Sequence, residues 1–115
     1  EYFSAAHKLR GYQGKCEELH GHNWKVIVAV AAKRLDDIGL AIDFKILKNK
    51  LKQVLENLDH KYLNDLAYFK RVNPTSENIA QYLFGEFTPK INNKDLKIKS
   101  VTVWESESSC AAFYK

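Results

Sequence analysis

The stretch HGHNWKVIVAVAA, residues 20–32, is the longest segment of the sequence with the character of a β-strand. Successive side chains of a strand point to opposite faces, so every second residue shares a face. One face therefore carries His20, His22 and Trp24, followed by three valines. The stretch predicts a long strand that presents two neighbouring imidazoles from one face.

The sequence predicts three further strands, one before this stretch and two after it. Residues 1–9 alternate in the same way, with Phe3, Ala5 and His7 on one face. The C-terminal region holds two more strand-like segments, separated by a short turn. The expected strands are residues 1–9, 20–32, 96–105 and 109–115, and the expected connections are a loop over residues 10–19 and a turn over residues 33–42.

Two helices are expected between the second and the third strand. The first begins at Asp43, a residue type that caps helix N-termini, and runs to about Leu58. The second begins at residues 74–76 and runs to about Phe87, and the intervening residues 59–73 show no regular pattern. An apolar stripe at helical spacing marks the first helix. Its members are Phe44, Leu47, Leu51, Val54, Leu55 and Leu58.

The order strand, strand, helix, helix, strand, strand predicts an α+β fold. We expect a four-stranded antiparallel sheet with two helices on one face, in a single domain over residues 1–115. Such a sheet has two exposed edges, which are prone to pair with other strands. Joining of strands between subunits into a barrel would remove both edges.

The composition is that of an ordinary globular protein, with 115 residues, 45% hydrophobic and 28% charged. No apolar run is long enough to span a membrane, and no signal-peptide pattern opens the chain. Two cysteines are fewer than a secreted scaffold of this size usually carries, so we expect reduced thiols and a cytoplasmic protein. A single disulfide between Cys16 and Cys110 is an alternative that the sequence leaves open. Because methionine is absent, we expect the natural N-terminus to lie upstream of Glu1.

A net charge of +4 and a pI of about 9.0 suit an anionic partner, such as a phosphorylated small molecule. A slightly basic surface without a specific partner explains the same charge. The lysines are spread along the chain and there is no arginine-rich arm, which disfavours nucleic acid as the partner.

Three histidines form a candidate zinc site. His20 and His22 point the same way from one strand, and His7 can lie opposite them if the first two strands pair as a hairpin. Three neutral imidazoles leave the fourth position of a tetrahedral zinc ion open, which is typical of catalytic sites. Surface or core histidines without a role in metal binding are the alternative that the spacing alone leaves open.

Several other residues have both a chemical and a plain interpretation. Cys16 is a fourth zinc ligand, a thiol activated by a nearby metal, or an ordinary loop cysteine. His60 is a proton-transfer group oriented by Asp59, or a cationic residue that favours a helix C-terminus. Thr75 and Ser76 fit a helix cap. Glu105, at a strand end, is either a solvated acid or a carboxylate that binds the edge of an amino-pyrimidine through two hydrogen bonds.

Taken together, these segments resemble the pterin synthase family with the tunnelling fold. The matching segments occur in the family's order and cover nearly the whole chain. They are FSAAH at 3–7, CEELHGH at 16–22, IDF at 42–44, LDHKYLN at 58–64, PTSEN at 74–78 and WE at 104–105. The resemblance is closest to the branch of queuosine biosynthesis that forms 6-carboxytetrahydropterin. In the family's enzymes of tetrahydrobiopterin synthesis, which form 6-pyruvoyltetrahydropterin, the loop before the cysteine is typically longer.

The resemblance implies a role for each matching residue. It implies zinc as the cofactor, a catalytic triad, and a set of residues that bind the pterin ring. The zinc ligands would be His7, His20 and His22; the catalytic residues Cys16, Asp59 and His60; and the pterin-binding residues Glu105, Thr75 and Ser76. It also implies a homo-oligomer, a trimer or a hexamer, with active sites between subunits.

The implied reaction is the zinc-dependent conversion of 7,8-dihydroneopterin triphosphate to 6-carboxy-5,6,7,8-tetrahydropterin, with release of acetaldehyde and triphosphate. Lys8, Arg10 and Lys15 are candidates to hold the triphosphate. One alternative is elimination of triphosphate to give the pyruvoyl product. A non-catalytic metal- or purine-binding module and a basic RNA-binding domain are alternatives from other classes.

Overall fold

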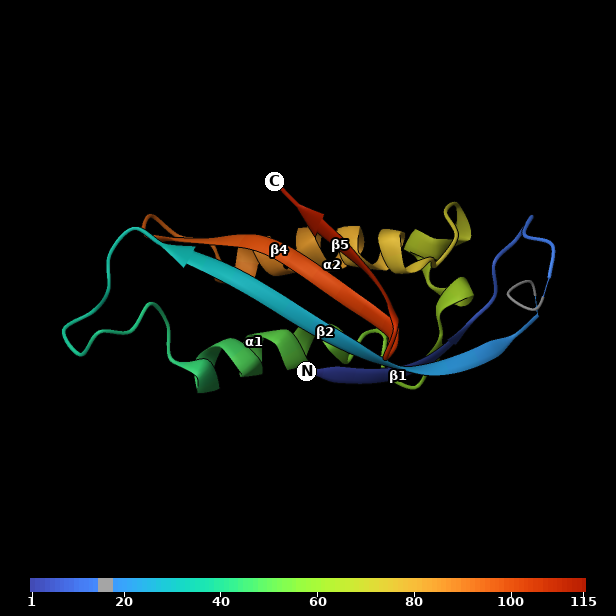
Figure 1. Ribbon diagram of the computed structural model, residues 1–115, viewed down its shortest axis with the longest axis horizontal. Coiled ribbons are helices and arrows are strands. Elements are labelled where there is room, and N and C mark those ends of the chain that lie inside the picture. The colour runs from blue at the N-terminus through green and yellow to red at the C-terminus, as the bar shows by residue number, and fades with distance from the viewer. Residues whose placement is uncertain (15–17) are drawn as a thin grey trace.

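A computed structural model describes residues 1–14 and 18–115 of the chain. It contains five strands and two α-helices in the described residues (Figure 1). The strands are β1 (Tyr2–His7), β2 (His20–Ala32), β3 (Lys61–Tyr62), β4 (Leu96–Ser106) and β5 (Ser109–Tyr114). The helices are α1 (Phe44–Leu55) and α2 (Ser76–Ile91). Two 3₁₀ turns, Leu63–Asp65 and Ala67–Lys70, lead from β3 towards α2.

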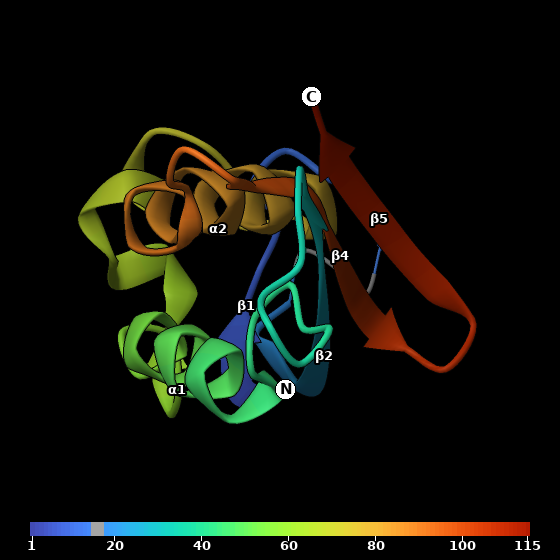
Figure 2. The same ribbon diagram turned by 90° about the vertical axis from the view of Figure 1, so that its left-hand side faces the viewer.

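The strands form one sheet in the order β3-β1-β2-β4-β5. The two expected hairpins, β1–β2 and β4–β5, are present, and β2 pairs antiparallel with β4 to join them. Both helices lie on the same side of this sheet, with α2 against β4 and β5 and α1 beside α2 (Figure 2). The α+β fold class is therefore confirmed.

The expected strand count of four was wrong, because a fifth strand lies in the segment taken as irregular. The two residues of β3 pair in parallel with Ala5 and Ala6 of β1. A strand of two residues is too short to show an alternation of apolar side chains in the sequence. It places the turn at Asp59 and His60 against the outer edge of β1.

The long strand β2 supplies the centre of the core, as its pattern predicts. Trp24 and Val26 are buried, while Lys25 and Ile27 point to the exposed face. Phe3 and Ala5 of β1 lie on the same buried face. The histidine end and the core end of β2 thus share one side of the sheet, so the metal-ligand candidates face the helices.

The helices differ from expectation in their ends and at one apolar residue. Asp43 caps α1 as predicted, since its side chain accepts a hydrogen bond from the Lys45 N–H at 2.7 Å. Phe44 was expected in the apolar stripe, but it is 76% exposed in the first turn. Helix α2 runs past the expected end to Ile91 and contains, near its C-terminus, Pro89, which has no N–H to donate to the carbonyl four residues earlier. None of the helices in the described residues has the length and apolar character that a membrane crossing requires.

Gly85 lies on an open part of the surface of α2, so it should accept a larger side chain. It lies in the helix interior, and a Cβ built there meets no atom within 4 Å. Because glycine loses more backbone entropy than alanine on folding, Gly85→Ala should stabilise the protein by about 0.5–1 kcal/mol. Urea unfolding with an unchanged m-value measures the shift. A fall in the free energy of unfolding would contradict the open surface around this residue.

Candidate metal centre

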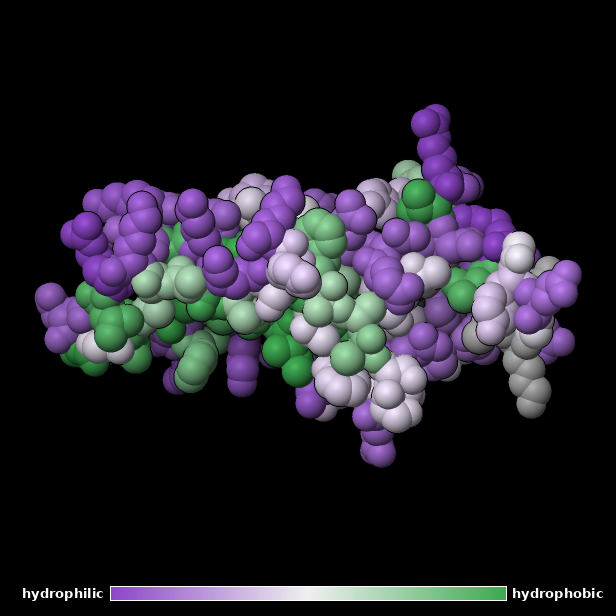
Figure 3. All heavy atoms as spheres, turned by 45° about the horizontal axis from the view of Figure 1, so that its top comes forward, coloured by the Kyte–Doolittle hydropathy of each residue, from purple (hydrophilic) through white to green (hydrophobic). Residues whose placement is uncertain are grey.

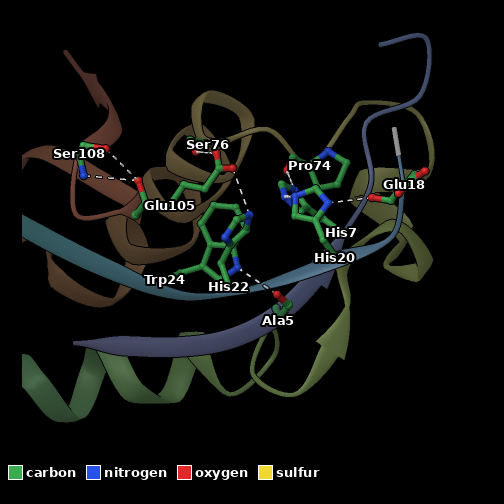
Figure 4. A network of polar contacts seen from close by, with 11 residues as sticks. Ala5, His7, Glu18, His20, His22, Trp24, Pro74, Ser76, Glu105 and Ser108 are labelled. Carbon is green, nitrogen blue, oxygen red and sulfur yellow. Dashed lines mark hydrogen bonds and ion pairs between the residues drawn. The ribbon is translucent and has the colours of Figure 1, made fainter. Parts of the chain in front are cut away.

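The pairing of β1 with β2 brings three histidines together. His7, the last residue of β1, lies directly opposite His20, and Ala5 lies opposite His22. Because residues two apart on a strand share a face, all three rings project to the same side of the sheet. Figure 4 shows them converging below the loop that carries Pro74. The expected triangle of imidazoles is therefore present.

Backbone carbonyls fix the orientation of two of these rings. His7 Nδ1 donates to the Pro74 carbonyl at 2.7 Å, and His20 Nδ1 donates to the Glu18 carbonyl at 2.7 Å. A carbonyl oxygen can only accept, so each Nδ1 carries the hydrogen and each neutral ring keeps a lone pair on Nε2. The two Nε2 atoms lie 2.9 Å apart. Two lone pairs that face each other at this distance favour a shared cation.

The third imidazole has an unsatisfied nitrogen in the same place. His22 Nε2 is buried and has no hydrogen-bond partner among the described residues, although Glu105 Oε1 lies 3.1 Å away. The contact with the carboxylate is therefore close but poorly directed. The other oxygen of Glu105 accepts a hydrogen bond from Ser76 Oγ at 3.2 Å. A buried nitrogen without a hydrogen-bond partner, beside a carboxylate, fits the role of a metal ligand.

Burial favours the neutral form of His7 and His22, the form that binds a metal. Only 1% of His7 is exposed, and this burial lowers its pKa. Burial also lowers the pKa of His22, with the negative charge of Glu105 acting in the opposite direction. The indole of Trp24 forms the floor, edge-on to the rings of His7 and His22 with centroids 4.9 and 5.0 Å away. Its Nε1 donates to the Ala5 carbonyl at 3.2 Å.

The donors are close enough to hold one metal ion. The ligand atoms of His7, His20, His22 and Glu105 all lie within 4.8 Å of one another. Nitrogen donors about 2.0–2.1 Å from a tetrahedral zinc ion stand about 3.3 Å apart, so only small ring movements are needed. The residues therefore fit a divalent metal that prefers imidazole ligands.

The pterin-binding candidates separate into two groups. Ser76 joins the metal centre through its contact with Glu105. Thr75 instead caps α2, because its hydroxyl accepts a hydrogen bond from the Asn78 N–H at 3.1 Å. Cys16, the candidate catalytic thiol, lies outside the described residues, as does Lys15. Among the described residues Cys110 is a free, exposed thiol.

The acid–base candidates Asp59 and His60 form a pair of their own. His60 Nδ1 lies 3.0 Å from Asp59 Oδ2, and Asp59 Oδ1 accepts a hydrogen bond from the Ser4 N–H at 2.8 Å. His60 has a φ of 58°, the only positive value at a non-glycine residue in the described part of the chain. Such backbone strain is concentrated at functional sites. The His60 side chain lies at the edge of the sheet and is 83% exposed.

No hydrogen bond or ion pair between described residues joins this pair to the histidine cluster. His60 and His22 do line a common hollow of about 560 Å³, together with residues of β1 and β3. The pair sits at the β3 edge of the sheet, whereas His7 belongs to β1, His22 to β2 and Glu105 to β4, which are one, two and three strands away in the sheet order. Among the described residues of one chain, the two groups of candidate residues therefore share this hollow but no hydrogen bond or ion pair.

The hydrogen bond from Ser4 makes Asp59 a pH-dependent contributor to stability. That bond is the main cause of the lowered pKa of Asp59, and His60 adds to the lowering. A lowered folded-state pKa stabilises the protein above the ordinary carboxyl pKa and stops doing so as the pH falls through the folded value. Asp59→Asn should therefore destabilise the protein at pH 7 and have a smaller effect below about pH 4. Denaturant unfolding at both pH values tests this, and an equal effect at both would contradict it.

Arg10, a triphosphate-binding candidate in the sequence, makes hydrogen bonds within the chain. Its guanidinium donates to the carbonyls of Phe69 and Val72, at 2.5 and 2.9 Å. The side chain thereby fastens the loop before α2. Lys8 is exposed and carries no such bond among the described residues.

Sequence reasoning missed three contributors to the centre. The carbonyls of Glu18 and Pro74 orient two rings, but a backbone oxygen leaves no trace in the choice of residue. Trp24 had a signal, since it lies two residues beyond His22 on the same face of β2, but a buried tryptophan is also an ordinary core residue.

Comparison with known proteins bears on both the fold and the chemistry. A family model described as 6-pyruvoyl tetrahydropterin synthase matches residues 1–115. The 6-carboxy-5,6,7,8-tetrahydropterin synthase of Rickettsia typhi is 32% identical over 124 residues, covering 92% of this chain and 90% of that protein. Its namesake from Synechocystis sp. is 38% identical over 118 residues, covering 97% and 87%. The structure of Caenorhabditis elegans 6-pyruvoyl tetrahydropterin synthase matches with a TM-score of 0.87 at 29% identity, covering 100% and 91%.

These likenesses mark the chain as an enzyme of the tetrahydropterin synthase type. It belongs to the 6-pyruvoyl tetrahydropterin synthase family. The expected family resemblance is thus confirmed, and so is the expectation of a lyase-type enzyme. The alternative of a non-catalytic binding module is correspondingly disfavoured.

Proposed function

We propose that this chain converts 7,8-dihydroneopterin triphosphate and water to 6-carboxy-5,6,7,8-tetrahydropterin, releasing acetaldehyde and triphosphate, and that it does so in the cytoplasm as a step of queuosine biosynthesis. The observation that carries the proposal is the convergence of three imidazole nitrogens beside a carboxylate in a tetrahydropterin synthase fold. Relatives at 32% and 38% identity bear the name of the carboxy-forming enzyme.

Zinc is the metal we propose for the centre, held by His7, His20 and His22. Three imidazoles match the ligand set of catalytic zinc sites, which keep one position for water or substrate. Bound there, zinc would supply Lewis-acid polarisation of the substrate's side-chain hydroxyl groups. Among the chain's own residues, burial favours the neutral form of His7, and the Trp24 indole packs edge-on against its ring.

Glu105 is proposed to anchor the pterin ring. A carboxylate can accept two parallel hydrogen bonds from the amino and amide N–H groups of an amino-pyrimidine. The Ser76 hydroxyl that donates to Glu105 Oε2 helps to hold the carboxylate in one orientation. Glu105 Oε1 lies 3.1 Å from His22 Nε2, so a pterin ring bound to Glu105 would lie beside the metal centre. Thr75 contributes by fixing the start of α2, which carries Ser76.

Proton transfer is assigned to Cys16, His60 and Asp59. Cys16, as a thiolate, is proposed to remove a proton from the substrate side chain. His60 is proposed to move a proton, with Asp59 as the partner of its Nδ1 at 3.0 Å. Each general acid–base step of this kind is typically worth about 100- to 10,000-fold in rate.

Cys16→Ala should retain zinc and lose turnover. A base that removes a proton can be lost without loosening a metal that three histidines hold. Metal content by mass spectrometry and turnover with dihydroneopterin triphosphate test the two effects separately. Loss of zinc from this variant would contradict the assignment and make Cys16 a ligand.

We also propose a homo-oligomer, a trimer or a hexamer, in which strands of neighbouring chains join into a barrel. The edge strands β3 and β5 have no further strand beside them in the described part of the chain. The sheet face away from the helices exposes Tyr2, Ile27 and Tyr114, and Figure 3 shows hydrophobic surface (green) across the middle of the molecule. Light scattering on the purified protein tests this, and a monomer would contradict it.

Product analysis tests the proposed reaction. The zinc-loaded protein is incubated with 7,8-dihydroneopterin triphosphate, and the products are separated and identified by mass spectrometry. Acetaldehyde and 6-carboxytetrahydropterin are expected. Release of triphosphate with 6-pyruvoyltetrahydropterin would instead assign the pyruvoyl-forming reaction, which is the name borne by the C. elegans neighbour. Turnover of neither kind would overturn the proposal.

A further inference from the structure

Two asparagine side chains take the place of a neighbouring strand just beyond the end of β1. Asn64 Oδ1 accepts the Lys8 N–H at 3.0 Å, and Asn64 Nδ2 donates to the Lys8 carbonyl at 2.9 Å. Asn73 makes the same pair of bonds to Arg10: its Oδ1 accepts the Arg10 N–H at 3.0 Å, and its Nδ2 donates to the Arg10 carbonyl at 2.9 Å. A side-chain amide that bonds both the N–H and the C=O of one residue imitates a strand-to-strand bridge. The chain after His7 is thereby held extended.

Asn73 also controls the residue that orients His7. It immediately precedes Pro74, whose carbonyl accepts the hydrogen bond from His7 Nδ1. The Asn73 carbonyl accepts a hydrogen bond from Asn78 Nδ2 at 2.9 Å, which ties the same residue to the first turn of α2. Pro74 is buried, and its ring fixes φ. Its carbonyl direction therefore depends on how residues 73 and 78 are held.

We propose that Asn73, with Asn78, is a positioning residue of the metal centre: it fixes the Pro74 carbonyl so that His7 presents an Nε2 lone pair to the metal. The inference rests on the metal binding in the proposed function. Without the two bonds to Arg10 and the bond from Asn78, the Pro74 carbonyl gains freedom to turn. His7 then loses the partner that selects its tautomer and ring angle.

Loss of such an orienting partner should weaken the metal without removing it. Loss of a partner that contacts a ligand typically costs about 10- to 100-fold in metal affinity. Asn73 acts on His7 through one intervening residue, so Asn73→Ala should weaken Zn²⁺ binding by about tenfold, at the lower end of that range. The Arg10 guanidinium still holds the carbonyls of Phe69 and Val72 in this variant, which favours a folded loop.

Competition for Zn²⁺ with a chromogenic chelator measures the affinity independently of turnover. Asn93→Ala is the matched control. Its side chain also makes two bonds to backbone, accepting the N–H groups of Asp95 and Leu96 at 2.8 and 2.9 Å, but it lies after α2 and away from the histidines. We expect Asn73→Ala to bind Zn²⁺ about tenfold more weakly than wild type and Asn93→Ala to match wild type.

Asn78→Ala keeps the inference testable if Asn73→Ala does not fold. Alanine is a better helix former than asparagine, so this change removes the bond to Asn73 with little loss of helix stability. It should also weaken Zn²⁺ binding. If Asn73→Ala and Asn78→Ala both bind Zn²⁺ with wild-type affinity, the inference is overturned but the proposed metal centre is not. A wild-type protein that binds no Zn²⁺ would overturn the metal centre and the inference with it.

Discussion

Replacing His22 with alanine should abolish both the bound zinc and the turnover of dihydroneopterin triphosphate. Its Nε2 is buried, lacks a hydrogen-bond partner among the described residues, and faces the Nε2 atoms of His7 and His20. Loss of an outer partner of a ligand costs about 10- to 100-fold in metal affinity, and loss of the ligand itself should cost more. The two remaining imidazoles would leave zinc with too few protein ligands for a stable catalytic site.

Asn23→Ala is the matched control for this experiment. Asn23 is the next residue of β2, and its side chain points to the other face, where it accepts a hydrogen bond from Ser4 Oγ at 2.6 Å. This variant should keep stoichiometric zinc. Metal analysis after dialysis against a weak chelator measures both variants. A His22→Ala protein with normal zinc content would remove His22 from the centre.

Replacing His60 with asparagine should give the complementary result, with zinc retained and turnover reduced. Asparagine tolerates the left-handed backbone at φ 58° better than most residues, so the fold of the turn should survive. It cannot act as a general acid or base near neutral pH, because its amide does not titrate there. The expected loss in kcat is about 100- to 10,000-fold. Steady-state kinetics with parallel metal analysis checks both parts, and near-normal kcat would contradict the assignment.

No hydrogen bond or ion pair between described residues of one chain links His60 to the histidine cluster, so a mixing experiment is informative. If a neighbouring subunit supplies His60, mixed oligomers of His22→Ala and His60→Asn chains contain some sites with both wild-type residues. Activity should then reappear on mixing two inactive proteins after mild dissociation and reassembly. Persistent inactivity of mixed oligomers would place both groups in sites formed within one subunit.

Much of the fold could be predicted because apolar side chains repeat at the period of the element. The alternation in residues 20–32 predicted the buried face of β2, and the N-cap at Asp43 predicted the start of α1. The period carries no information where an element is as short as β3. Phe44 fits the helical period, yet as the first residue of α1 it remains 76% exposed.

The three histidines of the metal centre could be predicted, because the geometry of paired strands determines where their side chains lie. Spacing by two places His20 and His22 on one face, and hairpin pairing places His7 opposite them. The partners of these rings could not be predicted, because Pro74 and Glu18 contribute backbone oxygens through tertiary contacts. The approach of Glu105 to His22 depends on the register between β2 and β4, which pairs Lys25 with Trp104. A single sequence does not fix that register.

X-ray absorption spectroscopy at the zinc edge of the metal-loaded protein determines which atoms bind the ion. We expect one zinc ion per chain, bound by three imidazole nitrogens with an oxygen from water or substrate in the remaining place. A sulfur neighbour at about 2.3 Å, the usual distance for a bound cysteine thiolate, would contradict this expectation. Fewer than three imidazoles around the ion would contradict it equally.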